Sequence, residues 1–162
     1  MTLADAVGRA AELTDERALA DLRRAVDEDL EAAARSQDYR ERALAYRAIG
    51  QLRFNQKTEL LRRGLEDESP AARGSSLIAL EGLSRTHPGD VNAFRPLLHE
   101  LAARDSNVAV RRLAVVCLKN GTPQRDTMQL LEGIAESDEE EAELRKTARV
   151  VQSSLKKKAL SR

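Results

Sequence analysis

Four segments of this 162-residue chain repeat one helical pattern, and this repetition constrains the fold more than any other feature of the sequence. Each segment begins at an arginine, and Arg42, Arg73, Arg111 and Arg145 follow one another at intervals of 31, 38 and 34 residues. Such intervals are typical of proteins built from stacked helix pairs. A small residue stands three places after each arginine (Ala45, Ser76, Ala114 and Ala148). Because small side chains let helices approach closely, we predict an array of packed helix pairs.

The composition predicts an all-α fold. Apolar residues recur at helical spacing almost from end to end. Aromatic residues make up only 2% of the chain, too few for a β-sandwich or barrel. We expect nine helices and no strand, forming one domain over residues 1–162. The expected parts are an N-terminal capping helix over 1–13, helix pairs over about 14–53, 54–86, 87–121 and 122–158, and a basic C-terminal tail over 156–162.

Three helix starts can be predicted from local residue types. Thr14 is a candidate N-cap, with Asp15 and Glu16 in the first turn that would follow it. Thr122 before Pro123 combines a capping residue with proline at the first helical position. The acidic run 138–141 is expected to begin the last helix, and Lys156–Lys158 to end it, because helix dipoles favour this order of charges.

The net charge is zero, with 27 basic and 27 acidic side chains, but the charges are segregated along the chain. Residues 126–143 hold eight acids and no base, whereas residues 144–162 hold seven bases and no acid. Most of this alternation is expected from helix-end charges. A neutral total argues against a protein whose whole surface attracts nucleic acid.

Targeting signals are not expected in this chain. Residues 1–13 include Asp5 and Glu12 and lack the basic leader and apolar core of a signal peptide. No charge-free apolar run approaches the roughly 20 residues that span a bilayer. The single cysteine suits a reducing compartment. We therefore expect a cytoplasmic protein with no membrane partner.

One copy of the repeat carries a recognisable order of residues: Pro96 to Leu101 (PLLHEL), then Asp105, Val110-Arg111, Ala114 and Cys117-Leu118. This order resembles the HEAT-repeat family, in its short bacterial form. The resemblance covers about residues 14–158 and implies a right-handed α-solenoid of about four helix pairs. The first copy departs at Glu41 and the last at Gln152, as terminal repeats commonly do. Tetratricopeptide repeats fit less well, because they need aromatic positions that this chain lacks.

The resemblance implies that each repeated arginine pairs with an acid in the turn of its own or a neighbouring layer. Asp67 and Asp105 each stand six places before such an arginine, and Glu139 holds the matching place in the last copy. A planar guanidinium suits two-point pairing with a carboxylate. Phosphate binding by the arginines is the alternative. We favour a structural ladder made of Arg42, Arg73, Arg111, Arg145, Asp67, Asp105 and Glu139.

Residues that could carry catalysis are few. His87 and His99 are the only histidines, and neither has a second ligand at metal-binding spacing. Cys117 lies on an apolar stripe, where a packed thiol is more common than a nucleophile. The chain has no glycine-rich phosphate loop. We expect no enzyme activity, no cofactor and no metal.

The family's geometry implies that the second helix of each pair lines a concave groove, with positions one, two, five and nine after each arginine facing it. Aliphatic side chains with basic edges suit an amphipathic, partly acidic peptide or helix. We therefore expect a scaffold or adaptor that binds a protein segment. The predicted binding residues are Arg47, Gln51, Ile78, Gly82, Arg112, Val116, Asn120, Lys146, Val150 and Ser154.

An alternative function is binding to the nucleic-acid backbone, because some bacterial HEAT-like proteins are DNA glycosylases with a basic concave face. Arg40, Arg42, Arg47 and Arg53 favour it, together with the lysines at 156–158. The lack of aromatic positions that would hold a base argues against it. The family also includes lyases and chaperones of bilin chromophores, which no residue here specifically supports.

Overall fold

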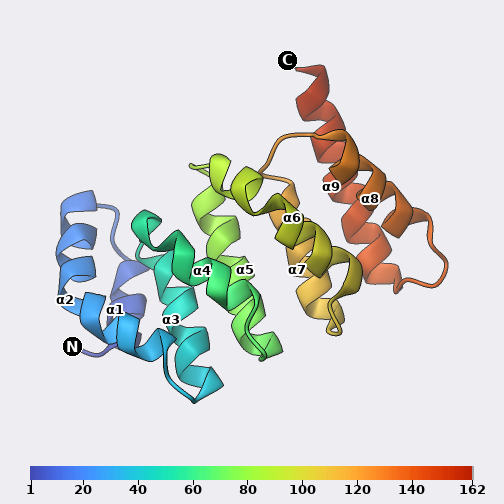
Figure 1. Ribbon diagram of the computed structural model, residues 1–162. Helices are drawn as coiled ribbons and strands as arrows, with labels where there is room; N and C mark the ends of the chain where they lie inside the picture. The colour runs from blue at the N-terminus through green and yellow to red at the C-terminus, as the bar shows by residue number, and fades with distance from the viewer. Residues whose placement is uncertain (162) are drawn as a thin grey trace. The chain divides into compact units, whose positions relative to one another are not determined.

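The computed structural model describes residues 1–161 and contains nine α-helices, one short 3₁₀ turn and no strand within that range (Figure 1). The all-α prediction and the expected nine helices are confirmed. The helices are α1 (Leu3–Ala10), α2 (Glu16–Ala34), α3 (Tyr39–Gln51), α4 (Thr58–Leu65), α5 (Pro70–Ser84), α6 (Gly89–Arg104), α7 (Val108–Leu118), α8 (Arg125–Glu136) and α9 (Ala142–Leu160). The 3₁₀ turn is Asn55–Lys57.

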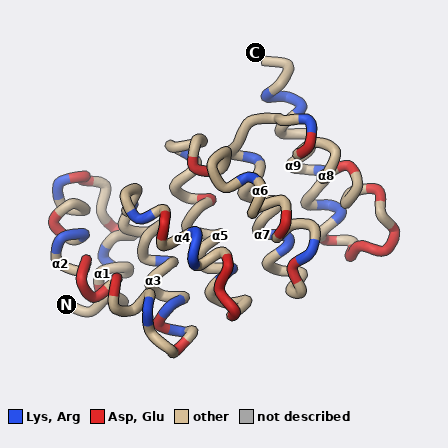
Figure 2. Tube along the Cα trace, viewed as in Figure 1, with Lys and Arg blue, Asp and Glu red and all other residues tan. Residues whose placement is uncertain are grey.

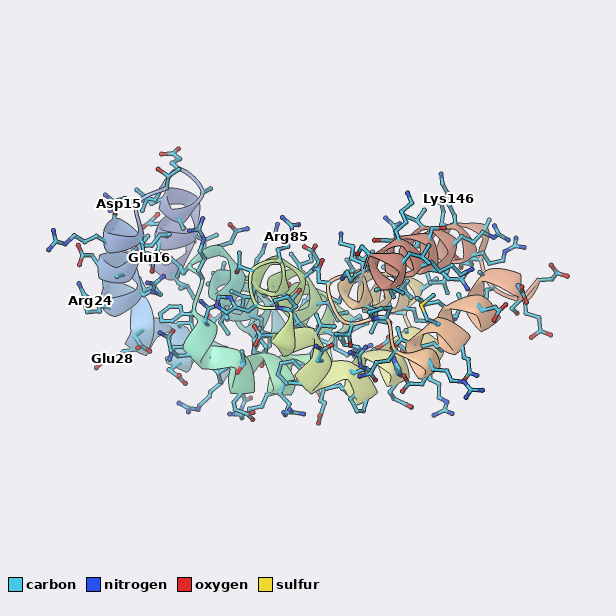
Figure 3. The ribbon with its side chains drawn as sticks, turned by 90° about the horizontal axis from the view of Figure 1, so that it is seen from above. Asp15, Glu16, Arg24, Glu28, Arg85 and Lys146 are labelled. Carbon is cyan, nitrogen blue, oxygen red and sulfur yellow. The ribbon has the colours of Figure 1, made fainter. Side chains whose placement is uncertain are left out.

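The chain forms two compact units, Met1–Leu83 and Ser84–Arg162. In the first unit, α1 packs against α2 and α3, α2 packs against α3, and α3 packs against α4. In the second unit, α6 packs against α7 and α8, and α9 packs against both α7 and α8. Within the second unit, α7 and α9 therefore form one side and α6 and α8 the other, as Figure 3 shows.

The small residues predicted at the helix contacts are buried. Ala45, Ser76, Ala114 and Ala148 are all 0% exposed. In the first unit, α3 approaches α5 so closely that a Cβ added at Gly50 would lie 2.7 Å from the Cα of Ala79. The remaining core is almost entirely aliphatic. Its largest fully buried side chains are Leu19, Leu30, Ile49, Leu52, Leu61, Leu65, Leu77, Leu80, Leu98, Leu118, Leu131 and Leu144.

Three predictions of helix ends are wrong. Asp15, not Thr14, caps α2, because its side chain accepts a hydrogen bond from the Arg17 amide. Helix α8 begins at Arg125 rather than Pro123, because the Thr122 hydroxyl is used in contacts with α6. Helix α9 begins at Ala142, after the acidic run 138–141.

The lysines assigned to a C-terminal tail over 156–162 belong to the last helix. Residues 156–160 lie in α9, Ser161 follows in a turn, and Arg162 lies outside the described residues. Lys158 anchors this part of α9, because its ammonium group donates to the carbonyl oxygens of Lys119 and Gly121 at 2.7 and 2.9 Å. No helix in residues 1–161 combines the length and the apolar character needed to cross a membrane.

Candidate functional site

The first of the repeated arginines, Arg42, holds a buried carboxylate. Arg42 on α3 donates through Nε and Nη2 to the two oxygens of Asp67, at 2.8 and 2.9 Å. The Arg42 and Asp67 side chains are only 12% and 6% exposed. Burial alone raises the pKa of Asp67, but the hydrogen bonds from Arg42 and the Ser69 amide outweigh it and hold the pKa below its usual value. Asp67 is therefore an ionised partner that joins the turn before α5 to α3.

A second pair of this kind lies in the other unit. Arg111 on α7 donates from Nη1 and Nη2 to the two oxygens of Glu140, both at 2.7 Å, and its Nε donates to the Ala102 carbonyl. The acid that pairs with Arg111 is thus Glu140 and not the predicted Glu139, which is exposed. The turn before α9 places Glu140 one residue beyond the position that the repeat spacing indicates.

The remaining predicted ladder residues have these contacts. Nη1 of Arg73 donates to the backbone carbonyl of Asp67 at 2.8 Å, and Nη1 of Arg145 lies 3.7 Å from Oδ1 of Asp138. The carboxylate of Asp105 accepts from the Asn107 amide at 2.9 Å. Among these residues, guanidinium groups and turn acids thus lie together at the starts of the second helices.

In the first unit, the predicted binding residues lie on α3 and α5. Arg47 and Gln51 are exposed on α3, and Gly82 is exposed on α5. Ile78 on α5 is 40% exposed, although it is a large aliphatic residue. The second-helix side of this unit therefore offers one exposed large aliphatic side chain, that of Ile78.

In the second unit, the predicted binding residues lie on α7 and α9, which pack together. Val150 is 62% exposed, and Arg112, Lys146 and Ser154 are exposed. Figure 3 shows Lys146 projecting away from α9 into open space. Val116 and Asn120 are half-buried, so they contribute less surface than the sequence predicts.

The cations of α7 and α9 fall into two groups. The first group has partners: Arg111 and Arg145 face loop acids, Arg149 donates to the Ala135 carbonyl at 2.9 Å, and Lys158 donates to two carbonyls. The second group is exposed and has no ion pair within the described residues. It consists of Arg112, Lys146, Lys156 and Lys157.

A buried polar cluster that the sequence did not indicate lies between α6 and the start of α8. Arg95 is only 4% exposed and donates to the Thr127 hydroxyl at 3.1 Å, to both oxygens of Thr122, and to Asn92. Burial lowers the pKa of Arg95, and the charge of Asp126 offsets part of this effect. The position of Arg95 in the sequence is a signal of its burial, because Arg95 falls at helical spacing among the buried Val91, Phe94 and Leu98.

His99 extends this cluster. Its Nε2 lies 2.8 Å from the Thr127 hydroxyl, and its Nδ1 lies 4.0 Å from Asp126. Thr127 is 0% exposed, so substrate has no access to its hydroxyl. The cluster joins α6 to α8.

Cys117 is 0% exposed and packs in the core, as predicted. Among the described residues, no three His, Cys, Asp or Glu side chains gather in a way that could hold a metal ion. No protein-family model matches the sequence, and no curated protein matches it significantly.

Proposed function

We propose that this chain is a HEAT-like helical repeat protein that binds a segment of another protein on its second-helix faces, without catalysis. In this proposal α1 is a cap, the repeats are the pairs α2–α3, α4–α5, α6–α7 and α8–α9, and the array is right-handed. The recurrence of arginine–carboxylate contacts at the starts of α3 and α7 supports a repeated unit.

The exposed aliphatic side chains carry the functional part of this proposal. Large apolar residues on the surface of a folded unit mark interaction sites when they lie together with polar groups that can orient a partner. Val150 on α9 is 62% exposed beside exposed cations, and Ile78 on α5 is 40% exposed beside the exposed Gly82. Both residues hold position five after a repeated arginine.

The experiment is quantitative capture of partners from an extract of the cells that make the protein, with Ile78→Glu and Val150→Glu as test variants. A glutamate at either position places a charge in the proposed interface. Ala32→Glu on α2 and Ala93→Glu on α6 are matched controls, because both alanines are exposed on first helices.

We expect a specific partner to be depleted with at least one test variant and retained with both controls. Equal recovery of all partners by the test and control variants would contradict the proposed faces. Far-UV circular dichroism on every variant shows whether the helices remain folded.

A further inference from the structure

The α7–α9 side of the second unit is deficient in acidic groups. Helix α7 has no acid, and α9 has only Glu143, in its first turn. The loop acids Glu140 and Asp138 lie against Arg111 and Arg145. Figure 2 shows this separation, with acids concentrated between α8 and α9 and bases following along α9. Exposed acids remain at the start of α9, at Glu139, Glu141 and Glu143. Beyond Glu143, the exposed cations of α7 and α9 have no acid on their own helices.

Equivalent residues of α7 and α9 form two rows on neighbouring helices. Arg112 and Lys146 each follow a repeated arginine by one residue, and Val116 and Val150 follow it by five. Residues four apart lie on the same side of a helix, so each helix presents a cation next to a valine. Val108, 37% exposed, and Ser154, exposed, extend the two rows. We define these six residues as the α7–α9 face.

The secondary structure of this face limits what conformation a bound peptide can have. An extended peptide gains affinity by adding to a sheet edge, and the described residues contain no strand. An amphipathic α-helix satisfies its own backbone hydrogen bonds, so it needs only side-chain contacts from this face. The rows 108–116 and 146–154 each span about 12 Å of helix, so a helical segment of about 18 residues is long enough to cover either row.

We infer that the α7–α9 face binds an acidic amphipathic helix of a partner protein. The apolar side of that helix contacts Val116 and Val150, and its carboxylates lie near Arg112 and Lys146. This inference rests on the proposed function and adds the chemistry of the partner. Charge complementarity at the rim of such an interface accelerates association and selects among partners.

Nucleic acid and membrane surfaces fit this face less well. Helices α7 and α9 contain no aromatic side chain on which a base could stack, and their exposed valines would lie against phosphates. Insertion into a bilayer needs a broad apolar side with Trp, Phe or Leu, whereas this face presents valines.

The test is fluorescence anisotropy with the full chain and a labelled probe peptide of about 18 residues, leucine on one helical side and glutamate on the other. Two further peptides replace every glutamate by lysine or by glutamine. We expect the glutamate peptide to bind most tightly. Its affinity should fall between about 0.1 M and 1 M salt, because the Debye length shrinks from about 10 Å to 3 Å.

The decisive variants differ in position and not in net charge. Arg112→Glu/Lys146→Glu should weaken binding of the glutamate peptide by about tenfold or more, since rim charges set encounter and specificity. Arg104→Glu/Arg125→Glu makes the same change in net charge on α6 and α8, where both side chains are exposed, and should leave binding nearly unchanged. Equal weakening by the two double variants would overturn the inference, because the effect would then be one of overall charge.

Other results separate this inference from the proposed function. If the glutamine peptide binds as tightly as the glutamate peptide and Val150→Glu abolishes it, the acidic class is wrong while protein binding stands. If duplex DNA or phosphatidylglycerol vesicles bind through Arg112 and Lys146 and no peptide does, the partner is not a protein helix. If no peptide binds and Val150→Glu loses no captured partner, the inference and the proposed face in the second unit both fail.

Discussion

Two buried arginines are accommodated in different ways in this chain. Arg42 lies against the ionised carboxylate of Asp67, whereas Arg95 donates only to neutral oxygens in the contacts seen for its guanidinium. A buried charge destabilises a protein unless its hydrogen-bonding capacity is satisfied. Both arginines meet this condition, and both connect segments that are distant in sequence.

Removing one partner of the Arg42–Asp67 pair should be more harmful than removing both. Arg42→Met leaves the Asp67 carboxylate buried without a counter-charge, and we expect a loss of about 3 kcal/mol in the free energy of unfolding. Arg42→Met/Asp67→Leu should recover most of this loss. Urea denaturation measures both values, and a double variant no more stable than the single one would contradict the interpretation.

His99 should make stability depend on pH. Burial lowers the pKa of His99 below 6.5; the charge of Asp126 raises this pKa and that of Arg95 lowers it further. The unfolded chain therefore binds a proton at this imidazole more readily than the folded chain does. The contribution of neutral His99 to the free energy of unfolding is complete above about pH 6.5 and is lost as the pH falls through the pKa of the folded state. When the pH is lowered from 7.5 to 5.5, the free energy of unfolding should therefore fall less for His99→Gln than for the unsubstituted chain. His87→Gln is the control, because it removes an exposed histidine; a slope unaltered by His99→Gln would contradict this role.

Arg53 has a backbone conformation that favours glycine. Its φ is 54°, and it lies in the turn after α3, in which the Phe54 amide donates to the Ile49 carbonyl at 2.9 Å. We expect Arg53→Gly to raise the free energy of unfolding by roughly 0.5–1 kcal/mol, because relief of left-handed strain exceeds the added entropy of the unfolded chain. Gln51→Gly, in the last turn of α3, should lower it instead. Thermal unfolding of the two variants tests the opposite signs.

At the scale of elements, close helix approach replaces large side chains in the core. Gly50→Ala would bring a Cβ to 2.7 Å from the Ala79 backbone, so α3 and α5 would have to separate. We expect a cost of about 1–3 kcal/mol. A Cβ added at Gly133 on α8 would meet no neighbouring group within 4 Å, so Gly133→Ala should instead raise the free energy of unfolding by roughly 0.5–1 kcal/mol. Chemical denaturation distinguishes these outcomes, and equal effects would contradict the packing argument.

The sequence predicted the type and number of helices better than their ends. Apolar spacing depends on which side of a helix is buried, and that signal extends over many residues. Helix ends depend on single competing contacts. Thr122 has the chemistry of a cap, but its hydroxyl is engaged by Arg95 and Asn92, and α8 starts at Arg125. Such tertiary contacts are not visible in a local pattern.

At the scale of the whole molecule, the neutral charge is the sum of two units with opposite charge. Residues 1–83 hold 13 basic and 16 acidic side chains, and residues 84–162 hold 14 and 11. The repeat spacing could indicate which residues share a helix side. It could not indicate that Val116 is half-buried, that Val150 is 62% exposed, or that Glu140 engages Arg111. These outcomes depend on how the neighbouring helices and loops cover each position.

Site-specific photo-crosslinking in the cells that make the protein detects directly whether a partner protein contacts the α7–α9 face. A photoreactive phenylalanine derivative replaces Val150 on the α7–α9 face in one variant, and the exposed Gln129 on α8 in a matched variant. We expect a discrete, light-dependent protein adduct from position 150 and none from position 129. An adduct from position 129 with none from position 150 would contradict it.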